Sequence, residues 1–250
     1  MKMPVYVVNL DCDAARMQSM ADQLDRLGLG FTRVPAVSGR DLPAAQREAL
    51  YDANANRLRF PLPMVDGEIG CYASHLTVWQ RLIANHQAAA LVLEDDVLLD
   101  PSLLPVLEAI KALPMGWDMV KLMGRDRESL WQRWPLIEGV SLVRYRRVPN
   151  QTGAYLLSAA GARKLLAGRR PFYRPVDIDL RHWWECGLRL FGTCPYPVRD
   201  GQAAEQSSIG RRDRGVGAAY RWRKILYQVG YSLQAWRANW RTRHDTPLAK

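Results

Sequence analysis

The sequence lacks the features that mark several protein classes. Its four cysteines, Cys12, Cys71, Cys186 and Cys194, include no Cys-x-x-Cys pair. We therefore expect neither a disulfide framework nor a zinc site, and predict buried, reduced thiols. No stretch approaches the roughly 18 uncharged apolar residues of a membrane span, and there is no internal repeat or low-complexity segment. With 48% hydrophobic residues, the chain can bury a core, and a soluble α/β enzyme is the class expected.

The N-terminal sequence MKMPVYVVNLDCD also lacks the hallmarks of a signal peptide. Its apolar run is short and meets Asp11 and Asp13 at once, and no cleavage site with small residues follows it. The sequence therefore predicts a cytoplasmic protein.

Positive charge is concentrated at one end of the chain. Residues 211–250 contain ten Lys or Arg and two Asp, so they carry +8 of the formal net charge of +10. The rest of the chain is nearly neutral. We predict a catalytic domain over residues 1–210 and a basic tail over residues 211–250.

Apolar runs and helical periodicities alternate along the predicted catalytic domain. Strands are expected at 5–10, 31–37, 89–96, 118–124 and 141–148, and helices at 13–27, 43–51, 67–85, 101–113 and 175–186. Residues 152–166 run from a strand into a helix, Asp66 is a candidate N-cap, and 54–66 is expected to be a loop. This alternation predicts an α/β fold with a mixed, mainly parallel sheet. Ligands of such sheets bind outside the carboxyl ends of the strands.

Three adjacent carboxylates interrupt the apolar stretch LVLEDDVLLD, residues 91–100. Because side chains alternate along a strand, Glu94 and Asp96 should share one face while Asp95 points to the other. An acidic pair of this kind can bind Mg²⁺ or Mn²⁺, which prefer hard oxygen ligands. An ordinary strand end, with solvated or helix-capping carboxylates, fits the spacing equally well. The spacing alone leaves both interpretations open.

LVLEDD also looks like the first strand of a response-regulator receiver domain, but two observations oppose this interpretation. The acidic residues of a receiver follow its first strand, whereas about ninety residues of α/β pattern precede Glu94 here. Asp118 opens its predicted strand, where a phosphoacceptor would have to close one.

The acidic motif is one of several segments that, in their order along the chain, form a recognisable pattern. They are YVVNLDCDAARM, GEIGCYASHLTVWQRL, AALVLEDDVLL, WDMVKLMG, TGAYLLSAAGARKLL and PVDIDL. Over roughly residues 4–210 the chain resembles glycosyltransferase family 25, the lipopolysaccharide and lipooligosaccharide galactosyltransferases. The resemblance implies a GT-A-like, single Rossmann-type domain that uses a UDP-sugar and Mn²⁺ or Mg²⁺. It further implies transfer of a hexose, with UDP-galactose as the favoured donor, to a lipid-linked oligosaccharide acceptor through a β-linkage. The alternatives are another UDP-sugar donor on the same fold, or a non-catalytic sugar- or nucleic-acid-binding protein that uses the basic tail.

The resemblance also assigns roles around the acidic cluster. Glu94, Asp95 and Asp96 occupy the place of the family's Asp-x-Asp motif. Asp96 is the first choice as metal ligand, and Glu94 is either a second ligand or a ribose contact. The loop after the first strand resembles the uridine-binding segment, so Asn9, Leu10 and Arg16 are candidate nucleotide contacts. Arg16 fits equally well as a solvated helix residue.

Further candidates lie on other predicted elements. Ser74 and His75, early in a helix, either approach the diphosphate or sugar or serve packing. Lys121 ends a strand and either contacts phosphate or sugar or is exposed. Gly153 and Tyr155 lie in a segment where the family binds donor or acceptor.

An inverting transfer needs a general base beside the acceptor hydroxyl. Asp177 and Asp179 in PVDIDL are the candidates; Asp177 matches the family's Pro-Val-Asp and is preferred, with helix N-capping as the alternative role. Ser207 and Ser208 match a serine-rich segment near the end of the family's catalytic region.

The basic tail has the pattern of an amphipathic helix between Tyr220 and Trp240. Its apolar residues are Trp222, Ile225, Leu226, Val229, Leu233, Trp236 and Trp240. We expect residues 217–243 to bind an anionic membrane surface, placing the protein on the inner face of the cytoplasmic membrane. A helix packed on the catalytic domain with its basic side exposed is the alternative. Nucleic acid is a disfavoured partner, because no nucleic-acid-binding module precedes the tail.

Overall fold

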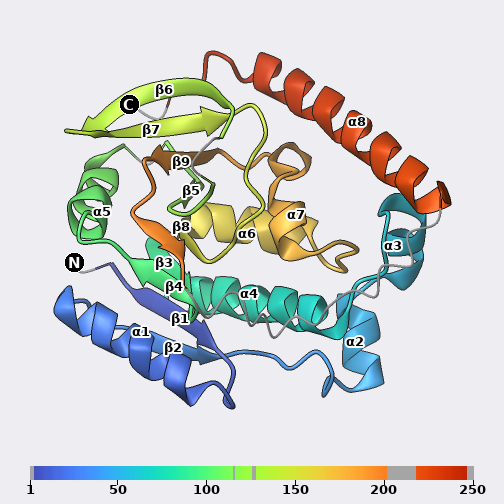
Figure 1. The fold of residues 1–250 in the computed structure, drawn as a ribbon, viewed down its shortest axis with the longest axis horizontal. Helices are drawn as coiled ribbons and strands as arrows, with labels where there is room; N and C mark the ends of the chain where they lie inside the picture. The colour runs from blue at the N-terminus through green and yellow to red at the C-terminus, as the bar shows by residue number, and fades with distance from the viewer. Residues whose placement is uncertain (1–2, 115, 126–127, 202–217, 247–250) are drawn as a thin grey trace.

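The computed structural model describes residues 3–114, 116–125, 128–201 and 218–246. Figure 1 shows a central twisted sheet with helices on both of its faces. The strands are β1 (Val5–Asn9), β2 (Thr32–Pro35), β3 (Ala89–Glu94), β4 (Val97–Leu99), β5 (Met119–Lys121), β6 (Leu130–Ile137), β7 (Val140–Tyr145), β8 (Ala154–Ser158), β9 (Leu190–Cys194) and β10 (Val198–Asp200). The helices are α1 (Ala14–Arg26), α2 (Ala44–Leu50), α3 (Ala53–Arg59), α4 (Asp66–Ala84), α5 (Leu103–Ala112), α6 (Ala159–Gly168), α7 (Val176–Leu180) and α8 (Ala218–Arg241).

The sheet has the order β2-β1-β3-β8-β5-β9-β7-β6 in the described residues. The pairings give β1, β2, β3, β5, β6 and β9 one direction, while β7 and β8 run against them. This confirms the predicted α/β class with a mixed, mainly parallel sheet. A separate two-stranded ribbon pairs β4 with β10.

Two hydrophobic layers cover the sheet because side chains alternate along its strands. One layer packs Tyr6 and Val92 beneath α4 and α6, and the other packs Val7 and Leu93 beneath α1 and α5. Burial on both faces explains why β1 and β3 are almost continuously apolar.

The structure differs from the sequence-based expectations in several elements. Residues 53–59 form α3 instead of a loop, with the Asp52 side chain accepting a hydrogen bond from the Ala55 amide at 2.7 Å. The strand expected over 89–96 ends at Glu94, and a turn at the next two residues leads into β4. The helix expected over 175–186 is a short α7 followed by a 3-10 turn. Strand β6, whose residues are mostly half-buried, was not predicted at all, and neither were β9 and β10.

Helix α4 begins at Asp66, so Val65 occupies the N-cap position predicted for Asp66. Two glycines bring this helix against the loop that follows β2. A Cβ on Gly70 would lie 2.3 Å from the Val37 carbonyl oxygen, and one on Gly39 only 1.9 Å from the Asp66 carbonyl oxygen. Gly70 of the GEIG segment therefore permits the backbone of α4 to contact the backbone of that loop.

The four cysteines are free thiols, as predicted. Cys12 contradicts the expected burial, since it lies exposed in the turn between β1 and α1. Within the described part of the chain, none of the helices combines the length and the apolar character needed to cross a membrane.

Helix α8 runs along the outside of the molecule, past α3 and α7 toward β6 and β7 (Figure 1). This confirms a helix in the basic tail. The boundary predicted near residue 210 falls outside the described residues and stays a prediction.

Candidate functional site

Two adjoining cavities open at the carboxyl ends of β1 and β3. The β1 cavity has a volume of about 310 Å³ and lies between the β1–α1 loop, the loop after β2 and the start of α4. The α7 cavity, of about 210 Å³, is lined by α7 and the segment before β8. Both cavities are lined by Cys71, Glu94 and Asp96. The acidic cluster thus lies where the two cavities meet, as expected for a ligand site of an α/β sheet.

Asn9 anchors one side of the acidic cluster. Its side-chain amide donates to Asp95 at 2.6 Å and to the Asp13 carbonyl oxygen at 3.0 Å, while its Oδ1 accepts from Arg33 Nε at 2.8 Å. Arg16 Nη1 lies 3.8 Å from the Asp95 carboxylate. Asp95 is therefore held toward β1, away from the α7 cavity that Glu94 and Asp96 line. The reason is a turn, not strand alternation, because β3 has already ended at Glu94.

Glu94 is oriented by a chain of hydrogen bonds from the core. Its Oε1 contacts His75 Nε2 at 3.2 Å and accepts from the Thr152 hydroxyl at 2.8 Å. Tyr155, fully buried, contacts His75 Nδ1 at 2.8 Å and accepts from Trp79 Nε1 at 2.9 Å. Burial alone would raise the pKa of Glu94, but the hydrogen bonds from His75 and Thr152 outweigh it and hold that pKa below its ordinary value.

These hydrogen bonds indicate the structural roles of His75 and Tyr155. In a neutral imidazole whose Nε2–H donates to the ionised Glu94, Nδ1 accepts from the Tyr155 hydroxyl. Both ring nitrogens of His75 are therefore engaged, and Tyr155 lies behind the histidine, lining neither cavity. His75 positions Glu94; it does not have a nitrogen left for a diphosphate.

Tyr155→Phe is expected to lower the free energy of unfolding by about 1–3 kcal/mol, because it strands the buried Trp79 and His75 nitrogens without a partner. Urea denaturation measures this loss. Tyr6→Phe is the matched control, since the Tyr6 hydroxyl also donates a hydrogen bond, to Gln87 at 2.8 Å, but lies outside the Trp79–Tyr155–His75–Glu94 chain. Equal unfolding free energies for Tyr155→Phe and the wild type would contradict the proposed chain.

Asp96 is the least compensated carboxylate of the cluster. Burial, together with the charges of Glu94 and Asp95, raises the pKa of Asp96 to about 6. A divalent cation would remove this repulsion, and carboxylate oxygens are ligands that Mn²⁺ and Mg²⁺ prefer. Asp96 and Glu94 therefore fit the metal predicted from the sequence, with the Oε1 of Glu94 already held in place.

A softer ligand set lies in the same place. In the described residues, ligand atoms of Cys71, His75 and Glu94 lie within 4.8 Å of one another. Burial raises the pKa of the Cys71 thiol well above its ordinary value, as do nearby carboxylates, which keeps it protonated. Because His75 is also committed to hydrogen bonds, this trio is better explained as packing around Glu94.

Asp177 lies in the α7 cavity, opposite the acidic cluster. Burial raises its pKa to about 6, and the charges of Glu68 and Glu94 act in the same direction. The buried Lys121 donates to the Gln151 carbonyl oxygen and lowers the pKa of Asp177 in part. Burial lowers the pKa of Lys121 itself to about 8. Lys121 thus lies beneath the cavity and is not the exposed strand-end lysine of the alternative prediction.

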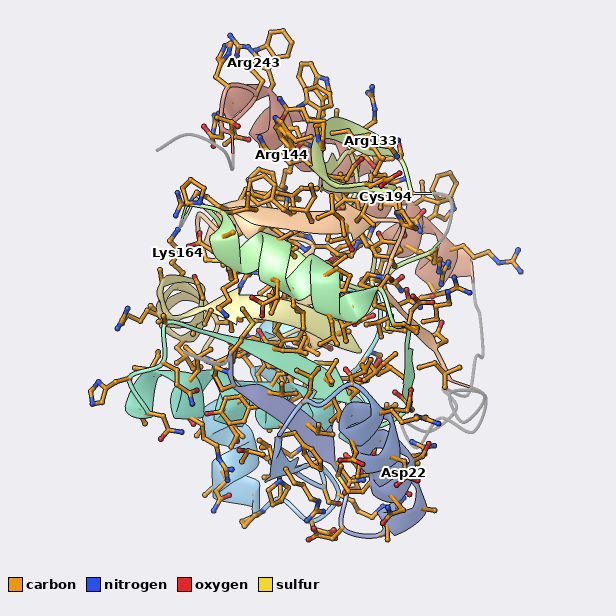
Figure 2. All side chains as sticks on the ribbon, turned by 90° about the vertical axis from the view of Figure 1, so that its left-hand side faces the viewer. Asp22, Arg133, Arg144, Lys164, Cys194 and Arg243 are labelled. Carbon is orange, nitrogen blue, oxygen red and sulfur yellow. The ribbon has the colours of Figure 1, made fainter. Side chains whose placement is uncertain are left out.

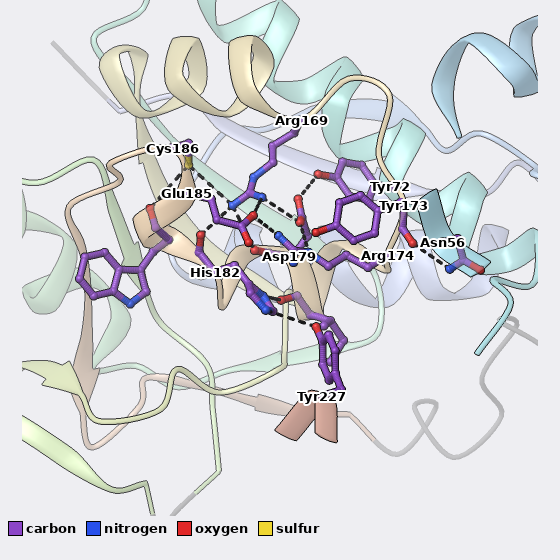
Figure 3. Close-up of polar contacts among 12 residues, drawn as sticks. Asn56, Tyr72, Arg169, Tyr173, Arg174, Asp179, His182, Glu185, Cys186 and Tyr227 are labelled. Carbon is purple, nitrogen blue, oxygen red and sulfur yellow. Dashed lines mark hydrogen bonds and ion pairs between the residues drawn. The ribbon is translucent and has the colours of Figure 1, made fainter. Parts of the chain in front are cut away.

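Asp179 points away from the cleft. Figure 3 shows it among Tyr72, Arg169 and Arg174 in a buried network. Its carboxylate accepts from the Tyr72 hydroxyl at 2.5 Å and from Arg169 Nη1 at 3.0 Å, and it pairs with Arg174. Only 3% of Asp179 is exposed. This placement contradicts its prediction as a catalytic base, because no substrate can reach it.

The other predicted residues divide into two groups. Leu10, Arg16 and Ser74 line the β1 cavity and Gly153 lines the α7 cavity. The Ser74 hydroxyl is buried and joins α4 to the loop after β2, accepting from the Val37 amide at 2.8 Å and donating to the Gly70 carbonyl oxygen at 2.7 Å. Ser207 and Ser208 lie outside the described residues.

Sequence reasoning missed several residues of the site. Thr152 binds Glu94, Arg33 holds Asn9, and Glu68 and Asp200 line the α7 cavity. Glu68 could have been found, since it lies inside the GEIG segment. The others come from elements whose neighbours depend on the sheet order, which local patterns do not encode.

The fold and site define a class: an α/β protein whose strand ends carry a carboxylate cluster between two ligand-sized cavities. A family model described as "Glycosyltransferase family 25 (LPS biosynthesis protein)" matches residues 2–134. The chain belongs to glycosyltransferase family 25, which confirms the resemblance inferred from its motifs.

Three relatives illustrate the family. A "Glycosyltransferase 25 family member" of Aedes aegypti is 30% identical over 185 residues, which cover 70% of this chain and 29% of that protein. Human "Procollagen galactosyltransferase 2" is 28% identical, covering 70% and 29%. Human "Inactive glycosyltransferase 25 family member 3" is 33% identical, covering 70% and 30%. The chain thus spans about three tenths of the length of these relatives.

Two solved structures are distantly similar. A glycosyltransferase involved in glycosylation of the major capsid of PBCV-1 has a TM-score of 0.42 at 9% identity, covering 92% of this chain and 100% of that chain. A197 from STIV has a TM-score of 0.44 at 9% identity, covering 79% and 83%. Likenesses at this level add nothing to the family assignment.

Proposed function

We propose that this chain is a nucleotide-sugar-dependent glycosyltransferase, and that it transfers a hexose to a terminal sugar of a lipopolysaccharide or lipooligosaccharide core. One observation carries the proposal: Glu94 and Asp96 line both cavities, and Asp177 lines the second cavity. This arrangement can hold a sugar nucleotide in the β1 cavity and an acceptor in the α7 cavity, with the base beside the acceptor and the acidic cluster between the two. Galactose from UDP-galactose is the favoured donor, since a relative is named a galactosyltransferase.

Different residues of the chain have separate roles in the proposed inverting transfer. Asn9, Leu10 and Arg16 line the cavity that would receive the nucleotide. Asp177, ionised above pH 6, takes the proton from the acceptor hydroxyl as that oxygen attacks the anomeric carbon and the nucleoside diphosphate leaves. Asp96 and Glu94 would hold a divalent cation, whose charge would neutralise the leaving diphosphate. Attack from the face opposite the leaving group gives the proposed β-linkage. The acceptor is lipid-linked, and the enzyme works at the inner face of the cytoplasmic membrane.

A donor-hydrolysis screen tests this function. We expect turnover of UDP-galactose, among UDP-, GDP- and CMP-sugars, that depends on Mn²⁺ or Mg²⁺. Asp96→Ala should lower it by about 10³-fold or more, because the cation loses its principal ligand. Asp22→Ala is the control, because Asp22 is exposed on α1 (Figure 2) and lines neither cavity. Full activity of Asp96→Ala would refute the metal assignment.

A catalytically silent sugar-binding member of the family is the second candidate. The human relative named inactive favours this alternative. It predicts that UDP-sugars bind, as calorimetry would detect, and are not hydrolysed with any metal. Measurable hydrolysis that depends on Asp96 would exclude it.

A further inference from the structure

Helix α8 exposes the side that amphipathic helices usually bury. Seven large apolar residues face solvent, with exposed fractions between 48% and 68%. They are Trp222, Ile225, Leu226, Val229, Leu233, Trp236 and Trp240. At about 100° per residue, they fall within a stripe roughly 100° wide that runs the length of the helix.

The opposite side of α8 fixes the helix to the body of the molecule. Tyr231, Ala235 and Ala238 are buried. The Tyr231 ring packs edge-on against His182 with centroids 5.1 Å apart, and Asn239 donates to the Tyr145 carbonyl oxygen at 3.1 Å. The apolar stripe therefore cannot turn inward without breaking these contacts. The alternative of a helix packed on the catalytic domain with its basic residues exposed is thus borne out, but α8 packs through the side opposite the apolar stripe.

The charges around the stripe indicate what covers it. Helix α8 contains no Asp or Glu. Arg221 flanks one edge of the stripe, Arg237 and Arg241 flank the other, and all three are exposed. Three of the seven stripe residues are tryptophans, and the rings of Trp236 and Trp240 stack with their centroids 6.2 Å apart. A surface that joins aromatic residues to a rim of one positive sign matches the interface of an anionic bilayer, where tryptophan rings lie at headgroup level.

We propose that the exposed apolar stripe of α8 docks the protein on an anionic lipid surface. The helix lies in the plane of the interface, with its aliphatic residues at the top of the acyl chains, its tryptophans at headgroup level and its arginines at the phosphate groups. Because His182 contacts α8 and lies just beyond α7, docking also places the element that carries Asp177 close to the membrane.

Binding of the full chain to sedimented vesicles tests the proposal. We expect binding to phosphatidylcholine vesicles that contain about 30 mol% phosphatidylglycerol, and much weaker binding to phosphatidylcholine alone. The triple variant Trp222→Gln, Trp236→Gln, Trp240→Gln should bind at least about tenfold more weakly. Arg237→Gln and Arg241→Gln should each weaken binding to the anionic vesicles about fivefold, since each basic residue near such a surface contributes about 1 kcal/mol.

Leu98→Gln is the matched control, because Leu98 is similarly exposed, at 48%, but lies on β4. It should bind as the wild type does. Unchanged vesicle binding by the triple variant would overturn the proposal. So would wild-type binding to oligonucleotides but not to vesicles, or a dimer that the triple variant abolishes while vesicle binding is absent. Donor hydrolysis in solution should be equal in the triple variant and the wild type, so failure of the docking proposal is distinguishable from failure of the proposed transferase.

Discussion

Asp177→Asn is expected to lower sugar transfer to an acceptor by about 10²- to 10⁴-fold, the range that a positioned general base contributes. Metal-dependent binding of the donor should remain, because Asp177 lines only the α7 cavity. The measurement compares transfer with donor affinity in the same preparation. Equal loss of both would place Asp177 in the donor site, and unchanged transfer would exclude it as the base.

The pH dependence of the reaction follows from the same residue. Burial raises the pKa of Asp177 to about 6, so transfer by the wild type should fall as the pH drops through 6 and the base becomes protonated. In Asp177→Asn, the residual transfer should no longer fall as the pH drops through 6.

The free energy of unfolding should fall with rising pH over the range in which activity rises. Between its ordinary pKa of 3.8 and its native pKa of about 6, folded Asp177 binds more protons than the unfolded chain does. The free energy of unfolding therefore falls as the pH rises through this window, and the full cost is present above pH 6. Asp177→Asn removes the buried charge and should raise the free energy of unfolding at pH 7.5 by about 1–3 kcal/mol. Urea denaturation at pH 7.5 measures this gain.

Asp179→Asn, only two residues away, is expected to have the reverse effect and to destabilise the protein by about 3–5 kcal/mol. The substitution removes the negative charge shared by Arg169 and Arg174, and leaves two buried guanidinium groups with Glu185 as their remaining carboxylate. It also weakens the 2.5 Å hydrogen bond from Tyr72. Figure 3 shows how these groups converge on the carboxylate.

Asp177→Asn serves as the matched control for this experiment, because the same substitution is made on the same short helix. Urea denaturation should separate the two variants by at least about 4 kcal/mol in unfolding free energy. If Asp179→Asn is as stable as Asp177→Asn, the ion-pair network does not have the structural role assigned to it.

The contrast between these two aspartates shows where sequence reasoning succeeded and where it stopped. Motifs identified the PVDIDL segment, and the family resemblance favoured Asp177. Which of the two carboxylates reaches the cleft depends on α7 being a single short helix, with Arg169 and Arg174 folded against one of its sides. Those arginines come from a loop whose course no local periodicity encodes.

The acidic cluster was found from the sequence for a simple physical reason: three carboxylates beside a buried strand need compensation. The compensation itself was not predictable in detail. Thr152 reaches Glu94 only because β8 inserts next to β3, and Asn9 reaches Asp95 only because β1 lies on the other side of β3. The apolar residues of α8 were likewise predicted correctly as a stripe, but their exposure follows from which side of the helix packs.

The antiparallel insertion of β8 between β3 and β5 also has a consequence for diversification. Strand β8 runs antiparallel to β3 and β5, so it begins at the edge of the sheet where those two strands end. The segment that precedes β8 therefore joins the site. The β1 cavity is built from loops that leave β1 and β2, and from the start of α4. If the α7 cavity takes the acceptor as proposed, insertions ahead of Thr152 would reshape acceptor selection without moving the residues of the β1 cavity, so that one scaffold can acquire new glycan targets independently of its sugar nucleotide.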